Sequence, residues 1–153
     1  GNEKNPLKDS LDNNNYTKIS IFLSVFDVHV NRMPLDASIK SINYVPGKFL
    51  NATLDKSSNE NERNIIYAKK NEDSFYIVQI AGLIARRIVC NIKINQEVIK
   101  GDRIGIIKFG SRVDLYIPQN YNILISKGQK VVGGETIISN PKNIQNIKSS
   151  ILK

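Results

Sequence analysis

Hydrophobic and polar residues alternate along most of this chain, with the period of two residues that is typical of β-strands rather than helices. The clearest run begins at Ile19, after which every second residue up to Val25 is aliphatic. The run is rich in β-branched and aromatic side chains, and valines continue it to Val30 before Pro34 ends it. The pattern therefore predicts a strand over residues 19–30.

Similar runs follow, separated by turn residues. They predict strands over 39–45, 65–69, 74–80, 84–94, 102–109 and 113–117. The turn Asn71-Glu72-Asp73 separates two of these runs, so we expect 65–69 and 74–80 to pair with each other. The polar stretch 55–64 predicts either a surface loop or one short capped helix.

Two turns share a Lys-Gly pattern between short apolar runs, at Lys100-Gly101 and at Lys127-Gly128. Because glycine accepts a positive φ, each predicts a tight hairpin. Paired turns of this kind resemble the barrel-sandwich folds of lipoyl- and biotinyl-carrier domains. In those domains a lysine at the hairpin tip carries the cofactor, whereas both lysines here precede the glycine. We therefore interpret the repeat as architecture.

The expected fold is mainly β: a compact single domain resembling a β-sandwich or barrel-sandwich hybrid. A chain of 153 residues has the size of one domain. The domain is expected over 16–139. A flexible polar arm is expected over 1–15, and a loose or weakly helical tail over 140–153.

The chain is basic, with 22 Lys and Arg against 14 Asp and Glu and a net charge of +8. Such a charge favours an anionic partner, namely nucleic acid, an anionic bilayer or a phosphorylated ligand. Solvated lysines in an Asn- and Lys-rich composition explain the charge equally well. One cysteine and one histidine, Cys90 and His29, exclude an intramolecular disulfide and a zinc site of the Cys/His type.

No run reaches the roughly 18 to 20 apolar residues that a membrane-spanning helix needs. The chain opens on Gly1 rather than Met, which indicates a processed or trimmed chain.

Candidate chemistry is concentrated in three segments. They are Asp27-Val28-His29-Val30-Asn31-Arg32-Met33-Pro34, the run 78–90, and Lys108-Phe109-Gly110-Ser111-Arg112-Val113-Asp114-Leu115-Tyr116. Taken alone, Gly110-Ser111 is explained by an ordinary turn between two strands. Together the segments resemble the short, prokaryotic-type phosphatidylserine decarboxylases, over roughly residues 16–139. Those enzymes cut their own chain before such a serine to make a pyruvoyl cofactor.

The resemblance implies cleavage between Gly110 and Ser111, a pyruvoyl group formed from Ser111, and conversion of phosphatidylserine to phosphatidylethanolamine. Decarboxylation of an α-amino acid needs an electron sink, which the pyruvoyl ketone provides. Ser111 Oγ would attack the Gly110 carbonyl, whose residue has no Cβ to obstruct it. The resemblance also makes His29 a residue that handles protons and contacts substrate. Its ordinary pKa suits it to protonate the carbanion that decarboxylation leaves.

The substrate carries a phosphate and a carboxylate, for which arginine is the preferred partner. The candidates are Arg32, Arg63, Arg86 and Arg87. Since neighbouring residues on a strand point to opposite faces, at most one of Arg86 and Arg87 reaches a common pocket.

Two departures from the resembled family stand out. Arg32 replaces a second histidine of the longer enzymes, and arginine is common there in the short branch. The upstream Ala-Asp-Gly segment, whose aspartate supports self-cleavage, is absent from this sequence. Either it was cut away or the chain does not mature efficiently. Asp114, three residues after Ser111, is a local alternative for the supporting carboxylate.

Three functions remain open. The first is a self-processing decarboxylase, made of β and α chains from one proenzyme and able to form homo-oligomers. It would act peripherally on the cytoplasmic side of the cell membrane, its anchor removed from this chain. The second is an uncleaved, non-catalytic relative that binds anionic phospholipid. The third, a small β-barrel that binds nucleic acid, ranks last because no aromatic-basic cluster of a recognised type is present.

Overall fold

Antiparallel β-strands are the predominant regular structure of the described residues, as the alternating pattern predicts. The computed structural model describes residues 2–7, 14–23, 30–83, 87–107, 111–130 and 139–141. The first strands are β1 (Asn2–Glu3), β2 (Tyr16–Leu23), β3 (Val30–Arg32) and β4 (Ala37–Val45), followed by the helix α1 (Ser57–Glu60). The later strands are β5 (Arg63–Lys70), β6 (Asp73–Ile80), β7 (Ile88–Cys90), β8 (Glu97–Val98), β9 (Arg103–Ile107), β10 (Ser111–Pro118), β11 (Tyr121–Ile123) and β12 (Ser139–Pro141).

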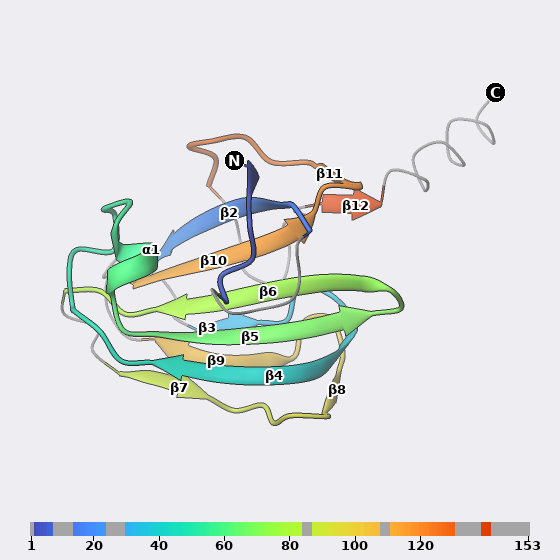
Figure 1. Cartoon of the computed structure of the whole chain (residues 1–153), viewed down its shortest axis with the longest axis horizontal. Coiled ribbons are helices and arrows are strands. Elements are labelled where there is room, and N and C mark those ends of the chain that lie inside the picture. The colour runs from blue at the N-terminus through green and yellow to red at the C-terminus, as the bar shows by residue number, and fades with distance from the viewer. Residues whose placement is uncertain are drawn as a thin grey trace.

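The described strands form one large sheet and two small ones (Figure 1). The large sheet has seven strands in the order β1-β2-β10-β6-β5-β4-β8, and a three-stranded sheet has the order β3-β9-β7. The third sheet pairs β11 with β12. This architecture confirms the expected mainly β fold.

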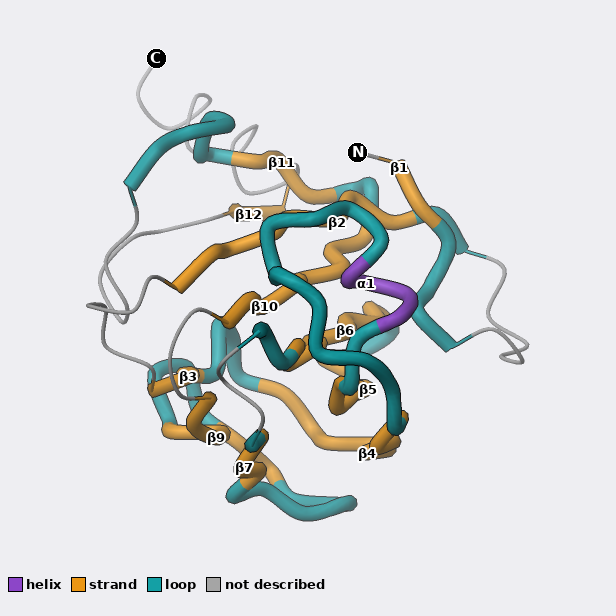
Figure 2. Tube along the Cα trace, turned by 90° about the vertical axis from the view of Figure 1, so that its left-hand side faces the viewer, coloured by secondary structure: helices purple, strands orange, loops and turns teal. Residues whose placement is uncertain are grey.

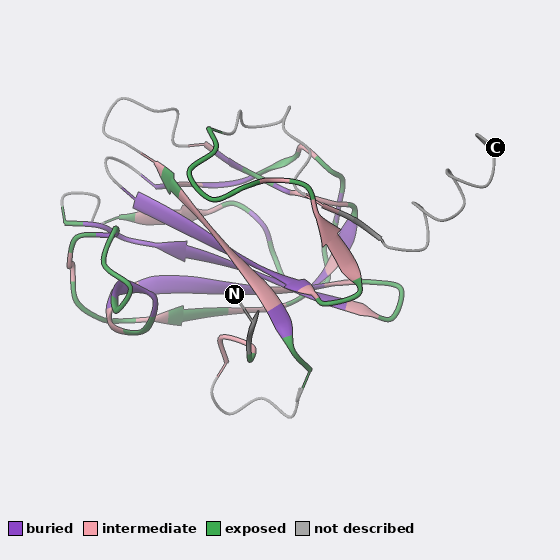
Figure 3. Cartoon of the chain, turned by 90° about the horizontal axis from the view of Figure 1, so that it is seen from above, coloured by how far each residue is buried: buried purple, intermediate pink, exposed green. Residues whose placement is uncertain are grey.

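The main hydrophobic core lies between the large and the three-stranded sheet. It contains Ile66, Ile77 and Leu115 from the large sheet together with Ile104 and Ile107 from β9, all nearly inaccessible to solvent. Figure 3 shows buried segments gathered in the middle of the molecule and exposed ones in the surrounding loops. Because side chains alternate along a strand, each strand of the large sheet also presents a second, outer face.

The outer face of the large sheet carries a second cluster built around tyrosines. Tyr76 packs edge-on against Tyr16, at 5.4 Å between ring centroids, and stacks on Tyr67 at 4.9 Å. Such ring pairs contribute beyond simple area burial. The cluster makes this face a second core rather than a solvated surface.

The segment 46–62 folds back over one end of the outer face and contains α1 (Figure 2). Lys48 N–H donates to the Glu60 carbonyl at 2.8 Å, and the Asn61 amide donates to the carbonyls of Leu50 and Ala81. The helix has no side-chain cap, and both Ser57 and Ser58 are buried. Of the two alternatives for this stretch, a short helix therefore forms, but it is packed and uncapped.

Two expected strands were placed too broadly. The strand expected over 19–30 is divided between two sheets, because β2 reaches Leu23 in the large sheet whereas β3 begins at Val30 in the three-stranded sheet; residues 24–29 lie outside the described ranges. The strand expected over 84–94 is only Ile88–Cys90, and residues 84–86 lie outside the described ranges. A regular alternation does not reveal where a chain passes from one sheet to another, which explains the first error.

The turn predictions are partly confirmed. Asn71 has a φ of 55° in the two-residue loop that joins the paired strands β5 and β6. Gly101 and Gly128 both have a positive φ, at 92° and 84°. However, the Gly101 turn is no hairpin, because β8 pairs with β4 whereas β9 pairs with β3 and β7. The turn instead carries the chain between the two sheets.

The expected N-terminal arm and the expected C-terminal tail both contain residues that pair with a neighbouring β-strand. Asn2–Glu3, within the arm expected to be flexible, pairs with Thr17 and Tyr16 of β2. At the other end Ser139–Pro141 pairs with β11, across the expected boundary at 139.

We expect Gly105→Ala to lower the free energy of unfolding by about 1–3 kcal/mol through overpacking. A Cβ at Gly105 would lie 2.1 Å from the Val89 carbonyl oxygen and 2.4 Å from Gln79 Nε2, so backbone would have to move. Urea unfolding followed by circular dichroism measures the change. An unaltered midpoint would show that β7 does not approach β9 as closely as described.

Candidate functional site

At one end of the molecule, strand ends from the large sheet and from the three-stranded sheet lie together. Ser111, the first residue of β10, pairs with Leu23 at the end of β2, and Arg112 pairs with Ile80 at the end of β6. In the three-stranded sheet, Val30 at the start of β3 and Ile88 at the start of β7 pair with Ile106 and Ile107 at the end of β9. Figure 2 views the molecule from this end.

Ser111 faces the core between the sheets. Its side chain is 1% exposed and lies on the same face of β10 as Val113, Leu115 and Ile117, which belong to that core. Among the described residues, its Oγ has no hydrogen-bond partner. Because buried hydroxyls in folded proteins are almost always paired, this free oxygen is a candidate reactive group.

A buried amide next to this end joins the two sheets. Gln79 of β6 is fully buried; its Nε2 donates to Asn31 Oδ1 of β3 at 2.9 Å and, more weakly, to the Val89 carbonyl of β7 at 3.4 Å. Its Oε1 accepts from Asn64 Nδ2 of β5 at 3.0 Å. We call Gln79, Asn31 and Asn64 the amide bridge. It fixes β3, which follows His29 in the chain, relative to the sheet that carries Ser111.

The opposite face of β10 holds a buried ion pair. Arg112 Nε donates to Asp114 Oδ1 at 2.6 Å, Arg112 Nη2 donates to Asp114 Oδ2 at 2.9 Å, and both residues are at most 2% exposed. Ser58 of α1 donates to Asp114 Oδ2 at 2.8 Å. Removing one member of a buried pair typically costs about 3–5 kcal/mol.

Asp114 therefore does not support attack by Ser111, and that local alternative was wrong. The two residues are three positions apart on one strand, so their side chains project from opposite faces. Both carboxylate oxygens of Asp114 are engaged by Arg112 and Ser58. Spacing in the sequence suggested proximity, whereas the strand geometry separates the two groups.

The predicted arginines are not all brought together with Ser111. Arg63 lies on the outer face of β5 and donates to the Asn61 carbonyl at 2.9 Å. Burial lowers the pKa of its guanidinium, an effect that the interaction with Tyr116 opposes. Arg32 donates to the Gly101 carbonyl at 2.9 Å, at the opposite end of β9 from Ile107.

Arg87 is exposed immediately before β7, at the same end of the molecule as Ser111. The three other predicted site residues, His29, Arg86 and Gly110, lie outside the described residues.

The amide bridge and the ion pair were missed by the sequence reasoning. Each left a signal, because Gln79 interrupts the apolar run 75–81 and Arg112 and Asp114 interrupt a run of strand-forming residues. A polar residue inside an apolar strand must find a partner when the strand is buried.

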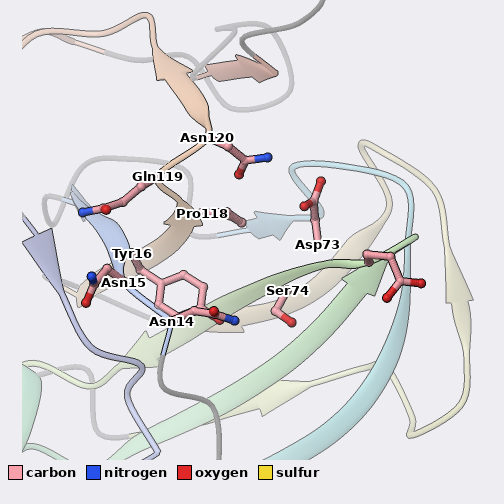
Figure 4. A pocket seen from close by; sticks show the side chains of 9 residues that line it. Asn14, Asn15, Tyr16, Asp73, Ser74, Pro118, Gln119 and Asn120 are labelled. Carbon is pink, nitrogen blue, oxygen red and sulfur yellow. The ribbon is translucent and has the colours of Figure 1, made fainter.

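A separate polar depression of about 350 Å³ lies at the other end of β10 (Figure 4). It is lined by Tyr16, Asp73 and Pro118 among others. Ser111 and Pro118 are the two ends of an eight-residue strand, roughly 24 Å apart at the usual rise per residue. The acidic Glu72 and Asp73 also make this depression unsuited to an anionic ligand. It is not part of the candidate site.

The described residues contain no cluster of His, Cys, Asp and Glu that would hold a metal ion. None of the helices in those ranges is long and apolar enough to cross a membrane.

We expect Gln79→Leu to destabilise the protein, because it leaves the Asn31 and Asn64 side chains buried without their partner. Each such loss costs about 1–3 kcal/mol. The control is Gln96→Leu, which removes only an exposed bond to the Lys93 amide. Urea midpoints of the two variants should differ clearly, and equal midpoints would contradict the amide bridge.

Comparison with known proteins gives one consistent result. The sequence profile of the phosphatidylserine decarboxylase family matches residues 2–139. The phosphatidylserine decarboxylase proenzyme of Wolbachia sp. subsp. Brugia malayi is 55% identical over 126 residues, which cover 82% of this chain and 55% of the relative. That of Ehrlichia chaffeensis is 56% identical over 123 residues, covering 79% and 54%.

A third proenzyme of the same name, from Pelagibacter ubique, is 50% identical over 135 residues, which cover 88% of this chain and 62% of the relative. The chain thus spans little more than half the length of the curated relatives it matches. The profile match over nearly the whole sequence and these identities place the chain in the phosphatidylserine decarboxylase family.

Proposed function

We propose that this chain forms the β domain of a self-processing, pyruvoyl-dependent decarboxylase that converts phosphatidylserine to phosphatidylethanolamine. The observation that carries the proposal is Ser111, whose Oγ is buried and without a partner among the described residues at the first position of β10. Family membership supplies the reaction class, since the relatives are named as proenzymes of this decarboxylase.

Maturation would begin with attack of Ser111 Oγ on the Gly110 carbonyl carbon, which moves the acyl group from nitrogen to oxygen and gives an ester. Loss of the Ser111 α-proton then expels the Gly110 carboxylate and leaves dehydroalanine. Addition of one water and release of one ammonia convert this residue into a pyruvoyl group on the Arg112 nitrogen. The products are two chains, one ending at Gly110 and one beginning with the former Ser111.

The site residues fit this chemistry in one respect and lack one component. The Ser111 Oγ, which has no hydrogen-bond partner among the described residues, is available as a nucleophile. The attack also needs a proton acceptor, and the Asp114 carboxylate is committed to Arg112 and Ser58. We assign the role to the aspartate of an Ala-Asp-Gly segment of the kind that the resembled enzymes carry, which this sequence does not contain.

When formed, the pyruvoyl ketone supplies the electron sink that loss of carbon dioxide requires. His29 would then deliver the proton that replaces the carboxyl group. The amide bridge supports this assignment, since it holds Asn31, two residues after His29 in the chain, against the sheet that carries Ser111. Arg87, with Arg86 beside it in the sequence, is our candidate for the substrate's anionic groups.

Exposed apolar side chains near Ser111 favour a lipid substrate at a membrane surface. Phe22 is 48% exposed and lies over Arg112, Leu54 is 42% exposed beside it, and Leu83 is 57% exposed just after β6. The net charge of +8 on the whole chain also favours peripheral binding to an anionic bilayer. We place the protein on the cytoplasmic side of the cell membrane.

Mutation of Ser111 tests the proposed cleavage. Intact-mass spectrometry of the complete polypeptide carrying this sequence should show two chains, with a pyruvoyl group at the start of the second. Ser111→Ala should give one uncleaved chain and no decarboxylation, because the nucleophile is gone, whereas Ser126→Ala, an exposed control, should behave as the parent. A parent protein that stays in one piece would favour the uncleaved lipid-binding relative instead.

Mutation of His29 separates decarboxylation from cleavage. We expect His29→Gln to be cleaved but to release phosphatidylethanolamine about 10²–10⁴ times more slowly, the usual contribution of a positioned acid or base. Steady-state assays on lipid-detergent micelles measure the loss. A cleaved variant with the parent's turnover number would remove His29 from the mechanism.

A further inference from the structure

The buried guanidinium of Arg112 makes contacts well beyond its ion pair with Asp114. Nη1 donates to the Ala52 and Leu54 carbonyls, each at 3.3 Å, and to Ser57 Oγ at 3.2 Å. Nη2 also donates to Ser58 Oγ, which in turn donates to Asp114. We call Arg112, Asp114, Ser57 and Ser58, with the two carbonyls, the Arg112 clamp.

The clamp joins segments that the proposed cleavage would separate. Arg112 and Asp114 follow the Gly110–Ser111 bond, whereas Ala52, Leu54, Ser57 and Ser58 precede it. Phe22, whose ring lies 5.4 Å from the guanidinium carbon, also precedes it. After cleavage these hydrogen bonds would therefore run between two chains.

Cleavage of the chain would not change the charge balance of the clamp. The positive charge of Arg112 is neutralised by Asp114 two residues later on the same strand, so both would remain in the second chain. The first chain contributes only neutral hydroxyl and carbonyl groups to the clamp. Within the clamp, cleavage would leave no buried charge unpaired, which makes the contact suited to a cleaved protein.

We infer that the Arg112 clamp is a positioning device that holds the new first residue of the second chain in the active site after cleavage. This inference rests on the function proposed above. Before cleavage Ser111 is tethered covalently on both sides, and afterwards on one side only. The neighbouring strands hold the backbone of β10, but Ser111 is its terminal residue, where a ladder frays most readily. The clamp fixes the adjacent residue from the outer face, one position from the reacting group.

The test uses Arg112→Lys in the complete polypeptide. Lysine keeps the positive charge beside Asp114 but cannot reproduce the planar fork that reaches Ser57, Ser58 and both carbonyls. We expect cleavage within about twofold of the parent, KM nearly unchanged, and a kcat lowered about 10- to 100-fold through misplacement of the reacting group. Arg103→Lys, at an exposed position of β9, is the matched control and should leave all three unchanged.

Ser58→Ala provides a second variant in case Arg112→Lys does not fold, since it removes one hydroxyl and no charge. It should lower kcat in the same direction by a smaller factor. A kcat equal to the parent's in both variants would overturn the inference, as would a fall in kcat that only follows the fraction of folded protein. Absence of cleavage in the parent would instead overturn the proposed function, so the two failures are distinguishable.

Discussion

The placement of β10 between β2 and β6 is the constraint on which the rest of the candidate site depends. Pairing on both sides fixes which residues of β10 face inward and which face outward, because a shift of one residue would exchange the two sets. In the observed register Ser111 joins the apolar core, and Arg112 and Asp114 face α1. The same strand thus carries a hydroxyl with no partner in the described part of the chain on one face and a paired charge on the other.

The second constraint is the contact between the two sheets, which is made partly by polar groups. Apolar side chains alone would let the three-stranded sheet settle in several neighbouring positions. The Gln79 amide, bonded to Asn31 and to the Val89 carbonyl, accepts few such positions, because displacement would leave buried donors unpaired. The absence of a Cβ at Gly105 makes room for this contact. The strand that follows His29 is therefore located by directional bonds rather than by packing alone.

Alternation along the chain was sufficient to predict the strands that stay within one sheet, such as β4, β5 and β6, and the turn at Asn71. It failed where the chain changes sheets, between Leu23 and Val30 and again at Gly101, since side-chain periodicity carries no information about pairing partners. For the candidate site, the sequence singled out Ser111, whose Oγ has no hydrogen-bond partner among the described residues, but it wrongly suggested Asp114 as the supporting carboxylate. Because side chains alternate along a strand, the position of a residue determines which face its side chain occupies. Which segments cover that face depends on parts of the chain that are distant in the sequence.

Segment 46–62 is such a distant segment, and its packing against β10 changes the environment of Arg112 and Asp114. If α1 did not pack there, Arg112 and Asp114 would be a solvent-exposed pair of little energetic value. Because Ala52, Leu54 and Ser58 cover the pair, it is shielded from water. Its polar groups form directional hydrogen bonds with these three residues. If the chain is cut before Ser111 as we propose, this contact would provide many directional hydrogen bonds in place of the missing covalent bond. A single active site would then persist across two chains without any new structural element.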